Sequence, residues 1–249
     1  MNKLKITLSV LIGLAVTTAC KKGDEDPFFS LASRKSRISG DWKMTSIESN
    51  YQYSDNSGYE YSGSISATET SIVENRTGFL YWHTNTAAVT EYSFTINRDG
   101  TWSSTKDLTT NFVRDYGSET STTPGHSVTT QSGTWAFVYK TKGEYKNKER
   151  VNFYVSSTVG MSDSSTTTTV YDNPSYPPTT EFNGASTYKE TYAGGENFFT
   201  YDLLMLKSKE MKWIMVESGN TANNYSDYVG PYSDSSEFTS NYEITWTAK

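Results

Sequence analysis

Cysteine, histidine and proline are scarce in this chain of 249 residues, which has one Cys, two His and six Pro. A single Cys excludes an internal disulfide framework and any zinc or iron–sulfur site built from several cysteines. The net charge of -6 comes without basic runs, which argues against binding to nucleic acid. The hydrophobic fraction is 35%, below the roughly 45–50% that is usual in globular domains.

Aromatic residues offset this shortage of aliphatic ones. The chain has 19 Tyr, 11 Phe and 6 Trp, and rings of this size bury enough apolar area to build a core. The length suits one domain or two small ones.

The N-terminus is typical of a secretion signal. Lys3 and Lys5 supply positive charge, and an apolar run follows from Ile6 to Ala19. As a helix rising about 1.5 Å per residue, this run is too short for a bilayer core of about 30 Å. A positive start, a short apolar stretch and a final small residue predict a signal peptide over residues 1–19.

The segment Val16-Thr17-Thr18-Ala19-Cys20 resembles a bacterial lipobox, with Thr17 in place of the usual Leu. The resemblance implies that Cys20 is lipidated and becomes the new N-terminus. The acidic run from Asp24 to Asp26 resembles the surface-export signal of Bacteroidetes lipoproteins. The alternative to lipidation is an ordinary signal peptide with an incidental Cys. The alternative to an export signal is that the charged residues only keep the tether over residues 20–37 solvated. The expected location is the bacterial outer membrane, at the cell surface, through an N-terminal acyl anchor.

Beyond a short segment that could be helical (28–37), the chain alternates apolar and polar residues with the period of half-buried strands. The predicted strands are 41–47, 79–82, 92–96, 101–103, 133–139, 150–155, 201–206, 211–216 and 242–247. The Asp99-Gly100 pair predicts a hairpin turn, and a second hairpin is expected at 207–210. Residues 115–132 and 161–197 are rich in Ser and Thr. They are expected to be long loops or irregular ribbons, or else strands that protrude from the body.

Several of these segments resemble lipocalin-like lipoproteins of Bacteroidetes. The motifs are Gly40-Asp41-Trp42, the Asp-Gly-Thr hairpin at 99–101, Gly133-Thr134-Trp135 and the hairpin from 203 to 214. The resemblance implies a single antiparallel up-and-down β-barrel over residues 38–249, with the long insertions outside it. It also implies that Gly40 and Trp42 close one end of the barrel.

Motifs that carry chemistry are missing from the sequence. His83 and His126 have no His, Cys or carboxylate pair at a metal-ligand spacing, so no metal is expected. His83 is expected at a strand end and His126 in a solvated loop. No Gly-x-Ser-x-Gly elbow, phosphate-binding loop or dinucleotide fingerprint occurs. The chain is therefore predicted to be neither an enzyme nor a cofactor carrier.

The tryptophans allow two interpretations. They form a barrel core, or some of them line a ligand cavity, for which the candidates are Trp82, Trp102, Trp135 and Trp213. Two tyrosine-rich segments are candidates for exposed contact surfaces: Tyr51, Tyr53, Tyr59 and Tyr61 in one, and Tyr225, Tyr228 and Tyr232 in the other.

Three functions remain open at this point. The first is a non-enzymatic lipoprotein that binds a small hydrophobic ligand inside a barrel. The second is an envelope interaction or assembly module whose core is filled by its own rings, and the third is a glycan-binding accessory protein. The first two differ in whether the barrel interior is empty and reachable. A cavity of a few hundred cubic ångströms would favour the ligand.

Overall fold

The computed structural model describes residues 33–55, 60–78, 82–138, 150–227 and 230–249. Within these ranges the chain forms one short helix, α2 (Arg34–Ile38), and after it strands only. The strands are β1 (Gly40–Asp55), β2 (Glu60–Thr68), β3 (Ser71–Gly78), β4 (Trp82–Ile96), β5 (Thr101–Asp115), β6 (Glu119–Phe137), β7 (Arg150–Ser162), β8 (Ser165–Tyr171), β9 (Thr179–Asn183), β10 (Ser186–Thr191), β11 (Phe198–Leu206), β12 (Glu210–Asp227) and β13 (Gly230–Ala248).

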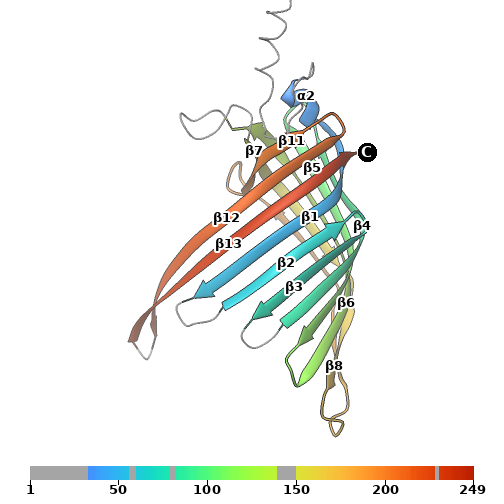
Figure 1. Cartoon of the computed structure of the whole chain (residues 1–249), viewed down its shortest axis with the longest axis vertical. Coiled ribbons are helices and arrows are strands. Elements are labelled where there is room, and N and C mark those ends of the chain that lie inside the picture. The colour runs from blue at the N-terminus through green and yellow to red at the C-terminus, as the bar shows by residue number, and fades with distance from the viewer. Residues whose placement is uncertain (1–32, 56–59, 79–81, 139–149, 228–229) are drawn as a thin grey trace, which may run out of the picture.

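The strands form a closed antiparallel barrel of ten strands (Figure 1). Consecutive strands pair from β1 to β7, and β11, β12 and β13 return to β1. β7 closes the ring because it bonds β6 on one side and β11 on the other. The predicted up-and-down barrel is therefore confirmed, with β8, β9 and β10 bonded outside the ring.

The ring is narrower at the end where α2 lies. There Gly40–Lys43 of β1 pair directly with Ser93–Ile96 of β4, which leaves the β2–β3 hairpin out of the ring. From Ser46 onward β1 pairs with β2 instead, and the hairpin joins the wall. Eight strands thus surround the axis at the narrow end. An interior of about eight strands is just wide enough for side chains to fill, whereas two more strands widen it.

Aromatic side chains fill the narrow end. Trp42, Trp102, Trp213 and Trp246 are fully buried, and Phe94 lies among them. The rings of Phe94 and Trp102 stack with centroids 4.9 Å apart, and Trp213 and Trp246 meet edge to face at 5.2 Å. Stacked and edge-to-face pairs satisfy the ring quadrupoles, so they add to the stability gained from burial.

Helix α2 covers part of this end of the barrel. Ser33 caps its N-terminus, and Ile38 is completely buried. The guanidinium groups of Arg34 and Arg37 donate hydrogen bonds to the carbonyls of Leu203 and Leu206 at the end of β11. These bonds hold the helix against the last residues of that strand.

Both predicted hairpin turns are confirmed. Gly100 has a φ of +97° in the turn between β4 and β5, a conformation that side chains with a Cβ rarely adopt. The second turn joins β11 to β12. The signal peptide predicted for residues 1–19, the first part of the tether and short segment predicted for 20–37, and most of the predicted strand at 79–82 lie outside the described residues.

Residues 60–78, for which no strand is expected, form β2 and β3. For the two Ser- and Thr-rich regions the structure selects strands over loops. β5 and β6 continue through residues 115–132 and turn at 116–118, and residues 161–197 contain the protruding strands β8, β9 and β10. Ser and Thr fit strands as well as loops, so composition alone left this choice open.

Candidate functional site

A cavity of about 300 Å³ lies inside the barrel, beyond the aromatic core and in the part that the β2–β3 hairpin widens. Its apolar wall includes Ile47, Ile65 and Ile72 from the first three strands. The other lining residues are Glu74, Asn85, Ala87, Tyr92, Lys106, Leu108, Thr110, Tyr201, Met215, Tyr242 and Ile244. A mostly apolar cavity with a few polar groups is typical of a small-molecule site, and this one is at the small end of the usual range.

Lys106 is the cationic group of this cavity. It shares the inward face of β5 with the core residues Trp102 and Leu108, because side chains two residues apart lie on one face. Its ammonium lies 5.3 Å from the ring centroid of Tyr92, within cation–π range. Burial among protein atoms lowers the pKa of Lys106, and the charge of Glu74 opposes this shift. The side chain of Lys106 is nevertheless exposed to solvent, so the cavity is open to water.

Glu74 is the acidic group of the cavity wall. The hydroxyl of Tyr51 donates a hydrogen bond of 2.8 Å to its Oε1 atom. Burial and the bond to Glu74 raise the pKa of Tyr51 well above its ordinary value. Burial also raises the pKa of Tyr92 to about 12. Both phenols therefore stay neutral near pH 7, and Glu74 and Lys106 are the acidic and basic side chains that line the cavity.

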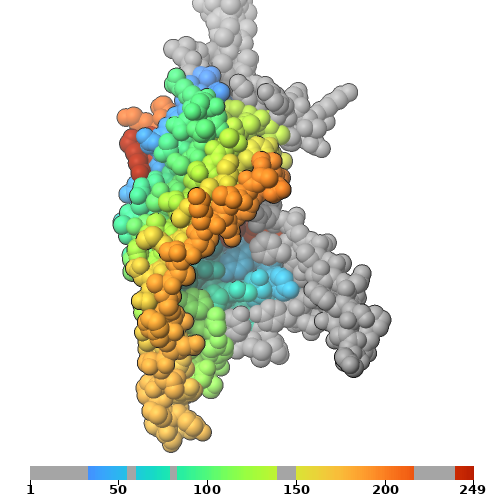
Figure 2. Space-filling view, turned by 180° about the vertical axis from the view of Figure 1, so that it is seen from behind, coloured from blue at the N-terminus to red at the C-terminus, as the bar shows by residue number. Residues whose placement is uncertain are grey.

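Beyond the ring of paired strands that closes the barrel, the ladder between β11 and β12 ends near the cavity. β11 bonds β12 only along Met211–Ile214, whereas β12 continues to Asp227. β10 bonds the far half of β7, and among the described residues no ladder joins β10 to β12. Figure 2 shows the molecule hollowed beside β10 and β11 (orange), with β2 and β3 (cyan to teal) in view behind them. The cavity residues Tyr201 and Met215 flank the last bonded pair of β11 and β12, where this opening begins.

Comparison with known proteins identifies no relative. No protein-family model, no curated protein and no solved structure matches this chain. The observed architecture is a ten-stranded barrel, and membership of the lipocalin-like lipoproteins stays a prediction.

Three of the four tryptophans predicted as candidate ligand contacts lie outside this cavity. Trp102, Trp135 and Trp213 are buried in the core, and none of them lines the cavity. The side chain of Trp82 lies outside the described residues. The aromatic rings that do line the cavity belong to Tyr92, Tyr201 and Tyr242.

The residues predicted to close one end of the barrel lie at its narrow end. Trp42 is 1% exposed, and its indole N–H donates a 2.9 Å hydrogen bond to the carbonyl of Ile38 in α2. Gly40 begins β1 and pairs with Ile96. This geometry ties the first strand to the helix, and the contribution of Trp42 to stability stays a prediction.

The two histidines have different surroundings. His83 is buried near the start of β4, and burial lowers its pKa. His126 lies on β6 and not in a loop, which corrects the expectation from its Ser- and Thr-rich surroundings. Its ring nitrogens lie 2.8 Å from Asp163 and 2.9 Å from Asp107, and these hydrogen bonds raise its pKa. His126 on β6 therefore links β5 to the turn between β7 and β8.

No metal centre or membrane-spanning helix is found in the described part of the chain. There, no three His, Cys, Asp or Glu side chains gather into a set that could hold a metal ion. The same residues contain no helix that is long and apolar enough to cross a membrane.

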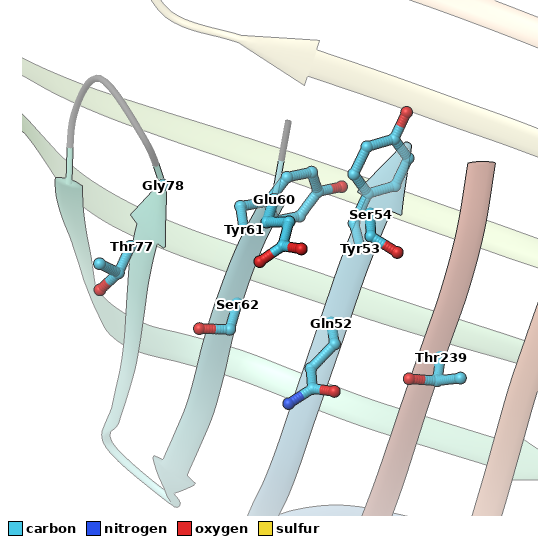
Figure 3. Close-up of a pocket in the computed structure, with 9 residues that line it drawn as sticks. All are labelled: Gln52, Tyr53, Ser54, Glu60, Tyr61, Ser62, Thr77, Gly78 and Thr239. Atoms are coloured by element: carbon cyan, nitrogen blue, oxygen red, sulfur yellow. The ribbon is translucent and has the colours of Figure 1, made fainter. Parts of the chain in front are cut away.

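A second pocket, of about 510 Å³, lies where β1, β2 and β3 approach their connecting loops (Figure 3). Tyr53 and Tyr61 stack there with centroids 4.7 Å apart. The guanidinium of Arg76 lies 3.6 Å above the Tyr61 ring. Of the tyrosines expected on an exposed surface, Tyr51 is buried, and Tyr53 and Tyr61 are half-buried. Tyr59 and the side chains of Tyr225, Tyr228 and Tyr232 lie outside the described residues.

Sequence reasoning missed Lys106, Glu74 and the isoleucines of β2 and β3. The sequence did contain a signal for Lys106. In an alternating strand it lies an even number of residues from Trp102 and Leu108, which places all three on the same face. A charged residue between two core residues of one strand face is the kind of local inconsistency that can mark a functional position, although Ser104 and Thr110 on the same face weaken the signal.

Proposed function

We propose that this protein binds a small hydrophobic ligand inside its barrel and carries out no chemistry of its own. The observation behind the proposal is the cavity of about 300 Å³ beyond the aromatic core. Burying apolar ligand surface against Ile47, Ile65 and Ile72 would contribute roughly 25 cal/mol per Å² before the costs of association.

The alternative of an assembly module with a filled core has support at one end of the barrel only. Four tryptophans fill the narrow end completely. The wider part, by contrast, holds the cavity and lies beside the opening between β10 and β12. An empty, reachable interior is what separates a ligand-binding barrel from an assembly module with a filled core. This criterion favours ligand binding in the wide part and a structural role for the narrow part.

We also propose that lipidation at Cys20 anchors the protein to the bacterial outer membrane and that the acidic run after Cys20 directs it to the cell surface. The support is the sequence alone, since these residues precede the described part of the chain. Several acyl chains exceed the two signals that stable anchoring requires. Removal of residues 1–19 takes away Lys3 and Lys5 and changes the net charge from -6 to -8, which disfavours contact between the barrel and anionic lipid headgroups.

Native mass spectrometry of the lipoprotein, purified gently from its own membrane, tests ligand binding. We expect an additional mass of small-molecule size that organic solvent releases. Ala87→Phe, which places a ring in the cavity, should abolish this mass. Ala88→Phe is the matched control, because Ala88 is exposed on the opposite face of the same strand. A bare protein mass, or equal ligand occupancy in both variants, would contradict the proposal.

A further inference from the structure

We infer that the inner face of the sheet that projects beyond the barrel binds an uncharged oligosaccharide. This face holds a groove of about 650 Å³ between β5, β6, β8 and β9, and its central residues are Ser121, Thr123, Thr167 and Thr169. We call it the polar groove. It adjoins the apolar cavity at Thr110, which lines both. The inference does not depend on the proposed function, because the ligand belongs to a different chemical class and contacts different residues.

The register of the strands creates the polar groove. Phe112 and Arg114 share the inward face of β5 with the core residue Leu108. On β6, Thr123 lies directly opposite Phe112, and Ser121 lies opposite Arg114. β8 and β9 extend the same face outward by two more strands. Figure 1 shows β8 beside β6 at the end of the molecule opposite α2.

Hydroxyl groups of β6 and β8 form pairs along the groove. The hydroxyl oxygens of Ser121 and Thr169 lie 2.8 Å apart, and those of Thr123 and Thr167 also lie 2.8 Å apart. The side-chain amide of Asn183 on β9 donates a 3.0 Å hydrogen bond to Oγ1 of Thr167. A hydroxyl group has one proton and two lone pairs, so each pair keeps one proton and at least two lone pairs for a ligand. The mutual bonds also hold the side chains in place, which lowers the entropy cost of binding.

Burial does not explain the composition of β8. This strand carries Thr at every position from 166 to 169, on both of its faces, and none of its side chains is buried. Thr suits a strand because its Cβ is branched, but Val and Ile suit it equally well. The hydroxyl groups are therefore the property that Thr contributes here beyond strand formation.

Two aromatic rings lie at one end of the groove. Tyr116, in the turn after β5, is 38% exposed. The guanidinium of Arg114 lies 5.1 Å from the ring centroid of Phe112 and 5.7 Å from that of Tyr116, and it donates a 2.7 Å hydrogen bond to the Tyr116 hydroxyl. A pyranose carries hydroxyl groups at its edge and C–H groups on its faces. It can therefore pack a face against an exposed ring while its hydroxyl groups reach the Ser and Thr pairs.

The charges of the groove favour a ligand without negative charge. Three carboxylates line it, those of Glu119, Asp163 and Glu181, against the single guanidinium of Arg114. Asp163 already contacts His126 at 2.8 Å. Carboxylates repel an anion but accept strong hydrogen bonds from hydroxyl groups.

The size of the groove suits a short oligosaccharide. A volume of about 650 Å³ holds roughly twenty non-hydrogen atoms, at about 30 Å³ for each water-sized group. This is close to the size of two linked hexoses. A longer chain can continue out of the groove, because β9 at its edge is exposed along its whole length.

An array of oligosaccharides that differ in charge tests the inference. It carries short gluco-, galacto- and manno-oligosaccharides in α and β linkages, together with sulfated oligomers and cationic glucosamine oligomers of the same lengths. The full chain is applied in phosphatidylcholine nanodiscs, and empty nanodiscs give the background. We expect binding to at least one neutral oligosaccharide. Its dissociation constant, measured by calorimetry, should change less than about 2-fold between low and high salt, because screening weakens only interactions between charges.

Substitutions in and beside β8 assign the binding to the polar groove. Thr167→Val keeps the shape of the side chain and removes its hydroxyl, so it should weaken binding about 3- to 10-fold, the effect of one hydrogen bond. Thr166→Val is the matched control, because Thr166 is exposed on the opposite face of the same strand. Tyr116→Ala should weaken binding at least about 10-fold, and Tyr116→Phe, which retains the ring, should keep most of the affinity.

Denaturant unfolding of each variant separates a structural role from a role in binding. If Thr167 serves only to pair β8 with β6, Thr167→Val lowers the unfolding midpoint and leaves the affinity unchanged, which would overturn its role as a ligand contact. Absence of binding to every neutral oligosaccharide, or binding to the sulfated or glucosamine oligomers alone, would overturn the ligand class. Unchanged affinity in both Thr167→Val and Tyr116→Ala would overturn the groove as the site. Where Thr167→Val does not fold, Tyr116→Ala decides, since Tyr116 is exposed in a turn.

Discussion

Tyr51 on β1 reaches across β2 to Glu74 on β3, where its hydroxyl donates a 2.8 Å hydrogen bond to the carboxylate. Gly63 is the residue of β2 that pairs with Tyr51, and the phenol ring lies over it. A Cβ at position 63 would lie 2.3 Å from Cζ of Tyr51 and 2.7 Å from the carbonyl oxygen of Asn75. The absence of a side chain at Gly63 therefore allows the bond between β1 and β3.

Gly63→Ala should destabilise the barrel, because the added methyl group displaces the Tyr51 ring and meets a backbone oxygen. We expect a loss of about 1–3 kcal/mol in the free energy of unfolding, as for other overpacked sites. Gly184→Ala is the control, since a Cβ there meets nothing within 4 Å. Denaturant unfolding followed by tryptophan fluorescence measures both, and equal midpoints would show that the strands adjust freely.

Trp42→Ala should cost about 3–5 kcal/mol of folding stability, because it removes a fully buried ring at the narrow end of the barrel. The hydrogen bond from its indole to the carbonyl of Ile38 is lost at the same time. Trp42→Phe, which retains most of the apolar volume, should cost less. An unchanged melting temperature in Trp42→Ala would refute the predicted role of Trp42 in closing the barrel.

The pKa values of the two histidines should depart in opposite directions from the ordinary value of about 6.5. Asp163 and Asp107 raise the pKa of His126, so its stabilising effect is complete below about pH 6.5 and is lost as the pH rises through the higher folded value. Burial lowers the pKa of His83, so its effect is present above about pH 6.5 and is lost as the pH falls towards the lower folded value.

NMR resonances of the ring Cε1–H groups measure both values directly, because the chain has only two histidines. Asp163→Asn should lower the pKa of His126 and leave that of His83 unchanged, since Asp163 is the first of the two partners that raise it. A His126 that titrates below His83 would be incompatible with the two carboxylate contacts.

Cys20→Ser should abolish membrane anchoring, because it removes the thiol that the predicted acylation requires. We expect an unprocessed or soluble protein. Ser9→Ala, in the predicted signal, is the control and should leave anchoring intact. If Cys20→Ser still sediments with membranes after a high-salt wash, the lipoprotein interpretation is wrong.

The amino-acid sequence by itself determined the all-β class and the inward face of several strands. Alternation places Trp42 and Met44 on one face of β1, and Asp99-Gly100 encodes its turn locally, since these properties depend on neighbours within a few residues. Only the tertiary structure decided the rest. The pairing of Gly40–Lys43 with β4 narrows one end, and the β2–β3 hairpin opens a cavity below it. Ring closure depends on hydrogen bonds between residues far apart in the chain. For the same reason Lys106 could be assigned an inward face from its strand, whereas the apolar cavity wall that it joins could not be predicted.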